Sequence, residues 1–235
     1  MIAAMNTNLT NQVAIVTGAA GPYGEAIARA LAAAGARVAL NDINPDRIAR
    51  LAAEIRDSGG EAIDITADVG NKFQCVNIVE STREVWGRLD ILVNAISVRP
   101  HTSVIKMDEW EWMRCMDVNL KGTFLMSQLC GRVMSDENSD RGGAIINLVH
   151  TEKPSDPINA AFAASMAGVV GFAHACAREY EPYRIGVHTI LLGEGDNPTA
   201  TRLDDAGLPT DLAAAVVALC DDPDRARPSR LFLAA

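Results

Sequence analysis

The chain has 235 residues, of which 49% are hydrophobic, so it is long enough to bury a full-sized core in one or two domains. Its formal net charge of −9, with no cluster of Lys or Arg, argues against binding to nucleic acid or to an anionic membrane surface. No apolar run approaches the roughly 20 residues that span a bilayer, and residues 1–10 lack the basic start and apolar run of a secretion signal. The cysteines are scattered without metal-ligand spacing, so we expect a cytoplasmic protein without a metal site.

Apolar runs alternate with amphipathic segments along the whole chain. Short β-branched runs bounded by Gly, Asp or Asn predict strands, and alanine-rich or amphipathic segments predict helices. In chain order we expect a strand at residues 12–17, a helix at 25–34, a strand at 36–41, a helix at 45–58, a strand at 61–67, a helix at 71–86, a strand at 89–94, a long helical segment at 107–134, a strand at 143–149, a helix at 162–180, a strand at 185–192, a helix at 211–220 and a strand at 230–233.

This alternation predicts an α/β fold. Strands that alternate with helices form a parallel sheet that is covered on both faces. Right-handed crossovers then give a three-layer, doubly wound Rossmann fold, with a parallel seven-stranded sheet in the order 3-2-1-4-5-6-7 and helices on both faces. Because no linker, repeat or low-complexity segment interrupts the pattern, we expect residues 1–235 to form a single domain.

The turn after the first predicted strand is the candidate phosphate site. Gly18, Gly21 and Gly24 permit a tight turn, and the free N–H groups at the start of a helix attract a pyrophosphate. Asp42 ends the next strand, where a carboxylate accepts hydrogen bonds from ribose hydroxyls and repels a 2′-phosphate, so NAD is favoured over NADP. The alternative is that the glycines only allow close strand–helix packing and that Asp42 is a solvated turn residue.

Several motifs, in order along the chain, resemble those of the short-chain dehydrogenase/reductase family. Thr17, Gly18 and Gly24 match the family's Thr-Gly-x-x-x-Gly-x-Gly motif, and the segment at 118–124 resembles the one that holds its structural and catalytic asparagine, here Asn119. Asp68-Val69 resembles an adenine-contacting Asp-Val, and Asn94-Ala95-Ile96 resembles Asn-Ala-Gly. The resemblance implies cofactor contacts from Gly18, Gly21, Tyr23, Gly24, Asp42, Ile43, Asp68, Val69, Asn94 and Ala95.

The catalytic positions depart from the family pattern. The stretch Phe162-Ala-Ala-Ser-Met166-Ala-Gly stands where the family has Tyr-Ala-Ala-Ser-Lys-Ala-Gly. In the family the tyrosine transfers a proton and the lysine lowers the tyrosine's pKa, whereas a phenyl ring and a thioether can do neither. The position of the family's serine falls at Val149 or His150. We therefore expect no intact catalytic set, the family positions being occupied by Asn119, His150, Phe162 and Met166.

The phosphate turn also departs from the pattern. Pro22 replaces the middle glycine and has no N–H group, although the first turn of a helix tolerates proline. Tyr23 adds bulk where the family usually has an aliphatic residue, and Ile96 replaces a glycine. We expect NAD binding to be weakened or lost.

These substitutions together predict a pseudoenzyme. Family members usually form dimers and tetramers through the helices that match 107–134 and 162–180, and the family includes inactive subunits paired with active relatives. We expect a hetero-oligomer, a tetramer by family resemblance, with an active NAD-dependent short-chain alcohol dehydrogenase as the partner. The second helix keeps small, apolar residues that allow close helix approach, namely Ala163, Ala167, Gly168, Gly171 and Ala175.

Two alternatives come from other functional classes. The chain could be an oxidoreductase, isomerase or dehydratase with non-standard catalytic residues such as His150, because histidine acts as an acid or base near neutral pH. It could instead be a sensor of a nucleotide or an apolar ligand. The pair Phe162 and Met166 then either fills a disused pocket or lines a hydrophobic ligand site. His101 is expected to be a surface loop residue, and Asn119 to satisfy backbone groups of the long helix.

Overall fold

The structure is a computed structural model that describes residues 8–151, 159–193, 201–202, 212–222 and 231–234. Its strands form one parallel sheet in the order β3-β2-β1-β4-β5-β6-β8-β7. The strand bounds are β1 Val13–Thr17, β2 Arg37–Asp42, β3 Glu61–Thr66, β4 Ile91–Asn94, β5 Gly143–His150, β6 Ile185–Leu192, β7 Thr201–Arg202 and β8 Leu231–Ala234. The order of the first six strands confirms the predicted doubly wound architecture.

The sheet formed by the described residues has eight strands, one more than the seven predicted. The predicted seventh strand is β8, which pairs in parallel with β6. The additional strand β7 has only two residues and pairs with the outer edge of β8. A two-residue strand is too short to show the period-two alternation that identifies a strand in a sequence, which is why it was missed. Residues 211 and 230, where the last helix and strand were predicted to begin, lie outside the described residues.

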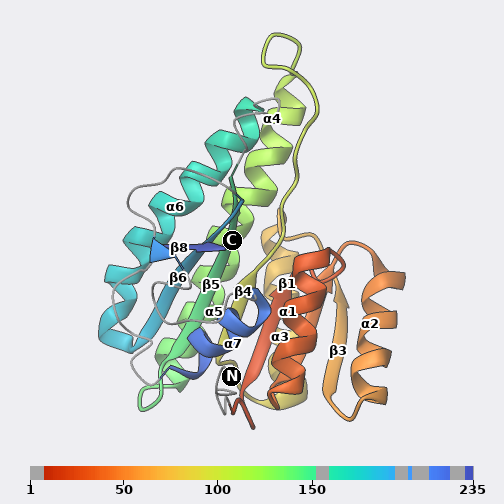
Figure 1. Cartoon of the computed structure of the whole chain (residues 1–235), viewed down its shortest axis with the longest axis vertical. Helices are drawn as coiled ribbons and strands as arrows, with labels where there is room; N and C mark the ends of the chain where they lie inside the picture. Colours follow the sequence, from red (N-terminus) through yellow and green to blue (C-terminus); the bar gives the residue numbers. More distant parts are fainter. Residues whose placement is uncertain (1–7, 152–158, 194–200, 203–211, 223–230, 235) are drawn as a thin grey trace.

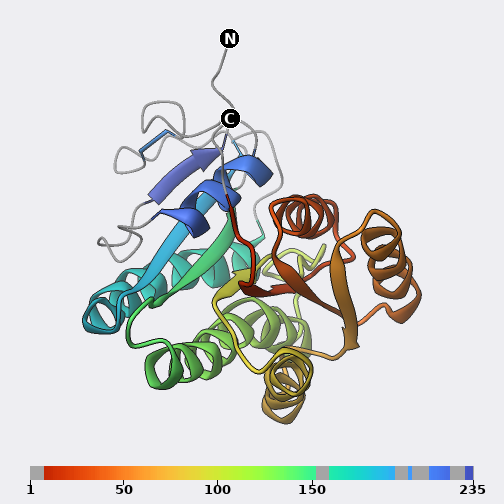
Figure 2. The ribbon, with the colours of Figure 1, turned by 90° about the horizontal axis from the view of Figure 1, so that it is seen from below.

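Helices cover both faces of the sheet. They are α1 Pro22–Ala33, α2 Pro45–Asp57, α3 Lys72–Trp86, α4 Glu109–Met116, α5 Gly122–Glu137, α6 Ala160–Tyr180 and α7 Leu212–Asp221, with a 3-10 turn at Glu181–Tyr183. Figures 1 and 2 show α1, α2 and α7 on one face and α3, α5 and α6 on the other. The central strands are therefore buried on both sides, which explains why they read as continuous apolar runs.

The two faces have separate apolar cores. On β1, Ala14 and Val16 belong to the core under α1, α2 and α7, whereas Val13 and Ile15 belong to the core under α3, α5 and α6. Successive side chains of a strand point to opposite faces, so one short strand contributes to both cores. This double burial fixes the register of β1, and with it the position of the turn that follows at Gly18.

The long helical segment is not one regular helix. It begins at Glu109, because the Asp108 side chain caps α4 by accepting from the Glu111 N–H group at 2.7 Å. A π-helical turn at Asp117–Lys121 then joins α4 to α5, which continues to Glu137. The prediction of a helical segment is confirmed, but its predicted bounds of 107 and 134 shift. The π turn places Asn119 at the irregular point, and such turns are frequent at functional sites.

Helix α6 is capped by Asn159, whose Oδ1 accepts from the Phe162 N–H group at 2.9 Å. Continued to Tyr183, this helix is long and apolar enough, by length and composition, to cross a membrane. The prediction that no apolar run approaches the length of a membrane span is therefore wrong for this helix. The helix packs against β5 and β6 and buries Phe162, Met166, Val169 and other residues in the core. Its apolar composition thus serves packing inside this fold.

Candidate functional site

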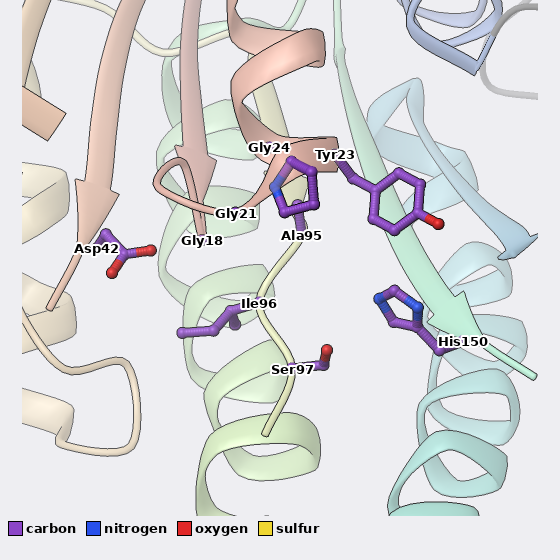
Figure 3. Close-up of a pocket in the computed structure, with 10 residues that line it drawn as sticks. Gly18, Gly21, Tyr23, Gly24, Asp42, Ala95, Ile96, Ser97 and His150 are labelled. Atoms are coloured by element: carbon purple, nitrogen blue, oxygen red, sulfur yellow. The ribbon is translucent and has the colours of Figure 1, made fainter. Parts of the chain in front are cut away.

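A pocket of about 250 Å³ lies at the carboxyl end of β1, next to the end of β4. Strand β1 pairs with β2 on one side and with β4 on the other, so this is the point where the strand order reverses. Ligands of doubly wound sheets bind at such a switch point. Figure 3 shows the pocket, which is lined by Gly18, Gly21, Pro22, Tyr23, Gly24, Asp42, Ala95, Ile96, Ser97 and His150.

The turn between β1 and α1 requires glycine at two positions. Gly18 has φ +68°, and a Cβ there would lie 2.8 Å from the Ala95 carbonyl carbon. A Cβ on Gly24 would lie 2.2 Å from the Gly18 carbonyl oxygen. Pro22 is the first residue of α1, so the helix start keeps the N–H groups of Tyr23 and Gly24 as first-turn donors. The predicted phosphate turn therefore has the compact geometry of an anion-binding helix start, with one donor fewer.

Asp42 is held in place by two backbone groups. Its Oδ2 accepts from the Ala20 N–H group at 3.2 Å, and its Oδ1 accepts from the Asn44 N–H group at 3.1 Å. The carboxylate lines the pocket and so faces the glycine turn. The next residue, Ile43, is exposed and is not among the lining residues. Asp42 is therefore a preorganised acceptor at one end of the pocket.

Aromatic rings gather at the other end of the pocket. The ring of Tyr23, from α1, lies 5.4 Å from the ring of His150, at the end of β5. The His150 ring lies 6.4 Å from that of Phe162, and the guanidinium of Arg99 stands 5.3 Å from the Phe162 ring centroid. Figure 3 shows Tyr23 and His150 pointing toward one another from two different elements. Burial, and then the positive charge of Arg99, lower the pKa of His150 below 6.5.

The positions of the family's tyrosine and lysine lie inside an apolar cluster. Phe162 is 3% exposed and Met166 is 4% exposed. Their buried neighbours in this cluster are Cys115, Val149, Ala161, Val169 and Leu191. Of the two candidates for the serine position, Val149 therefore points into this cluster, whereas His150 lines the pocket. This packing supports the interpretation that Phe162 and Met166 fill a disused pocket.

Asn119 connects three parts of the chain. Its Oδ1 accepts from the Val98 N–H group at 2.7 Å, and its Nδ2 donates to the Val98 carbonyl at 2.9 Å. The same Nδ2 lies 2.9 Å from the Ser165 Oγ and 3.3 Å from the Cys115 Sγ. Ser165 in turn donates to the Phe162 carbonyl at 2.8 Å. Asn119 thus fastens the segment after β4 to the helical segment and to α6, rather than facing the pocket.

Four of the predicted cofactor residues are not among the lining residues of the pocket, namely Ile43 and the three residues Asp68, Val69 and Asn94. The Asp68 carboxylate forms an ion pair with Arg114 at 2.7 Å and accepts from the Gly70 N–H group at 2.9 Å. Val69 is fully buried in the core under α3 and α5. Asn94 is buried, and its Nδ2 donates to the Asn147 Oδ1 at 2.9 Å. Gly18, Gly21, Tyr23, Gly24, Asp42 and Ala95 do line the pocket.

Ser97 and Arg99 were missed as site residues by sequence reasoning. Ser97 lines the pocket three residues after Asn94, and the resemblance of residues 94–96 to a cofactor motif could have drawn attention to it. Nothing in the sequence pattern marks Arg99, because its place over Phe162 depends on the path of the segment after β4. His101 is exposed and is not a lining residue. Within the described ranges, no three His, Cys, Asp or Glu side chains gather in a way that could hold a metal ion.

Comparison with known proteins gives matches along most of the chain. The family model described as short chain dehydrogenase matches residues 12–206. A 3-oxoacyl-[acyl-carrier-protein] reductase from Synechocystis is 34% identical over 189 residues, which are 80% of this chain and 75% of that protein. The (2S)-[(R)-hydroxy(phenyl)methyl]succinyl-CoA dehydrogenase subunit BbsD from Thauera aromatica is 30% identical over 226 residues, 96% of this chain and 90% of that protein. A crystal structure of a metagenomic short-chain oxidoreductase in complex with NADP has a TM-score of 0.79 and 28% identity, covering 97% of this chain and 98% of that one.

Proposed function

Because this chain belongs to the short-chain dehydrogenase/reductase family of oxidoreductases, we propose that it is a non-catalytic subunit of a larger dehydrogenase. It assembles with an active NAD-dependent short-chain alcohol dehydrogenase and supports the structure or the substrate pocket of that partner. The observation that carries this proposal is the burial of Phe162 and Met166 in an apolar cluster, at the positions that match the tyrosine and lysine of the family.

The chemistry of these two side chains supports an inactive site. A phenyl ring and a thioether have no proton to transfer and no N–H group to donate. Positioned proton transfer contributes roughly 10²–10⁴-fold to a rate, so its loss removes most turnover of an ordinary carbonyl–alcohol reaction. Asn119 does not compensate, since its amide bonds with the Val98 backbone and with Ser165.

An apolar surface on the helices supports assembly. On α4, Trp110 is 72% exposed and Met113 lies one turn further along. On α5, the half-exposed Phe124 meets Phe172 of α6 edge to face, with ring centroids 6.0 Å apart. Exposed apolar side chains that lie together, as in each of these two pairs, mark interaction sites, whereas those scattered singly do not.

Helix α6 also carries exposed small residues. Ala167, Gly171 and Ala175 are exposed and recur every four residues, so they lie on one face of the helix. A Cβ placed on Gly171 would have open space around it. Of the other predicted residues, Gly168 instead packs against Leu120. A face of small residues allows another helix to approach closely. Assembly is also supported by the Thauera relative, which is itself named as a subunit of a dehydrogenase.

The test is to produce the chain alone and together with an intact short-chain dehydrogenase encoded beside it, and to measure the masses by native mass spectrometry. We expect a mixed oligomer, in which Gly171→Trp abolishes the assembly because the indole fills the surface of close approach. Val85→Glu, at an exposed apolar position on α3, is the matched control and should leave the assembly intact. A homo-oligomer that ignores the partner, or disruption by the control alone, would contradict the proposal.

A second candidate is an enzyme with altered chemistry. It is favoured by one observation, namely that His150 lines the pocket beside Tyr23 and has a lowered pKa, which leaves the imidazole neutral and able to accept a proton at pH 7. The His150→Ala variant discriminates between the two candidates. Turnover that falls with this variant would support an enzyme, whereas a purified chain without turnover supports the non-catalytic subunit.

A further inference from the structure

Arg99 is held between two fixed points of the segment that follows β4. On one side, the Asn119 amide bonds both backbone groups of Val98, at 2.7 Å to the N–H group and 2.9 Å to the carbonyl. On the other side, the Asn159 Nδ2 donates to the Pro100 carbonyl at 2.8 Å. The backbone at Arg99 is therefore preorganised, although the residue itself is exposed.

The Arg99 guanidinium stands over a buried ring. Its central carbon lies 5.3 Å from the centroid of the Phe162 ring, and Phe162 is 3% exposed. The face of an aromatic ring attracts a cation within about 6 Å, so this contact favours one position of the guanidinium. A guanidinium carries five N–H donors in a planar fork, which matches the two oxygens of a carboxylate. Arg99 is thus a positioned cation of the type that pairs with carboxylates.

The surroundings of Arg99 favour a singly charged ligand. The His150 ring lies 6.4 Å from the same Phe162 ring. Burial, and then the charge of Arg99, lower the pKa of His150, so the imidazole is neutral at pH 7. One guanidinium charge beside a neutral imidazole suits a monoanion. The net charge of −9 on the chain also disfavours a doubly charged phosphate group.

An apolar surface lies next to this cation. The Tyr23 ring, which is 42% exposed, lies 5.4 Å from the His150 ring, and Ile96 lines the same pocket. Figure 3 shows the rings of Tyr23 and His150 on one side of this pocket and Ile96 on the other. Apolar and aromatic groups pack favourably on such a surface. The ligand class that fits is therefore a carboxylate on an apolar stem.

We infer that Arg99 is the anchor of a carboxylate-binding site, which takes a small organic monoanion whose apolar stem packs on the Tyr23 ring. The inference goes beyond the proposed function, since a subunit that only supports a partner need not bind a small ligand. It involves no bond making or breaking, so it is also independent of the second candidate function. The chain thus recognises a carboxylic acid by charge and shape without converting it.

NMR titration of the full chain tests this inference with benzoate and with benzamide, a neutral ligand of the same shape. We expect benzoate to bind about tenfold more tightly than benzamide, because only the carboxylate pairs with the guanidinium, a difference of about 1.4 kcal/mol. Arg99→Met keeps an unbranched stem without the charge, so it should weaken benzoate about tenfold and leave benzamide within about twofold. Arg99→Lys keeps the charge without the planar fork, so its loss should be smaller.

Arg47→Met, at an exposed arginine on α2, is the matched control and should leave benzoate affinity within about twofold of the wild type. Circular dichroism checks that each variant is folded. Four results would overturn the inference: no benzoate binding at millimolar concentration, equal affinity for benzoate and benzamide, unchanged benzoate affinity in Arg99→Met, or tighter binding of inorganic phosphate than of benzoate. None of these results bears on the oligomer masses, so this inference and the proposed function fail separately.

Discussion

Replacing Met166 by lysine puts back the residue type of the family but should damage the fold instead of restoring chemistry. Met166 is 4% exposed, and the other buried residues of its cluster are uncharged. An ammonium group placed there leaves a buried charge without a partner, which costs about 3–5 kcal/mol. Phe162→Tyr in addition would not offset this cost, because a neutral phenol cannot balance the ammonium charge.

The stability loss caused by Met166→Lys should depend on pH, and the pKa of the introduced lysine decides in which direction. Burial lowers the pKa of the introduced ammonium in the folded state. Between the folded and the unfolded pKa, the unfolded state binds one more proton, so stability rises with pH by about 1.4 kcal/mol per unit. The deficit relative to the wild type should therefore be larger at pH 7 than at pH 9.

Urea unfolding at both pH values measures the deficit. Met166→Leu is the packing control and should cost less than about 1.5 kcal/mol. Val85→Lys, on the exposed face of α3, is the charge control and should stay within about 0.5 kcal/mol of the wild type. A loss below about 1 kcal/mol for Met166→Lys, or a loss that does not change with pH, would refute the argument that this position is a sealed apolar site.

The remaining predictions concern the helical segment, two glycines and His150. Asn119→Ala removes one buried and two partly buried hydrogen bonds of about 1 kcal/mol each. Urea unfolding should therefore show a loss of about 3 kcal/mol, and a loss below about 1 kcal/mol would show that the amide is dispensable. Gly24→Ala brings a Cβ to 2.2 Å from a backbone oxygen and should lower the melting temperature strongly. The Cβ of Gly171→Ala meets open space, so this variant should raise the free energy of unfolding by about 0.5–1 kcal/mol. Stability changes of the same sign in both variants would contradict the turn geometry. The lowered pKa of His150 means that the unfolded state binds more protons below pH 6.5, so stability falls on acidification through that range. An NMR titration should give a midpoint below 6.5, and His150→Gln should make stability less dependent on pH in the acid range. A midpoint at or above 6.5 would contradict the burial of the ring.

Much of the architecture could be predicted from local patterns. Apolar runs at strand length, separated by helical segments, predict a parallel doubly wound sheet because burial on both faces needs apolar residues at every position. The positions of Gly18, Gly24 and Asp42 at strand ends then follow from the order of the elements. Helix α1 begins at Pro22, because proline is favoured at the first position of a helix, and α4 begins at Glu109, because Asp108 caps it. Both effects move a helix end by a few residues without changing the topology.

The contacts that decide the state of the site could not be predicted in this way. The residue identities alone show that a phenyl ring and a thioether stand at residues 162 and 166, and hence that no proton donor is present at either position. The packing of the folded chain is needed to show that both side chains are buried, that Tyr23 and His150 meet at the end of the pocket, and that Arg99 stands over Phe162. Periodicity reports which face of an element is buried, but it does not report which side chains from distant elements meet there. That choice depends on how α1, β5 and α6 pack, and it is made by the whole fold.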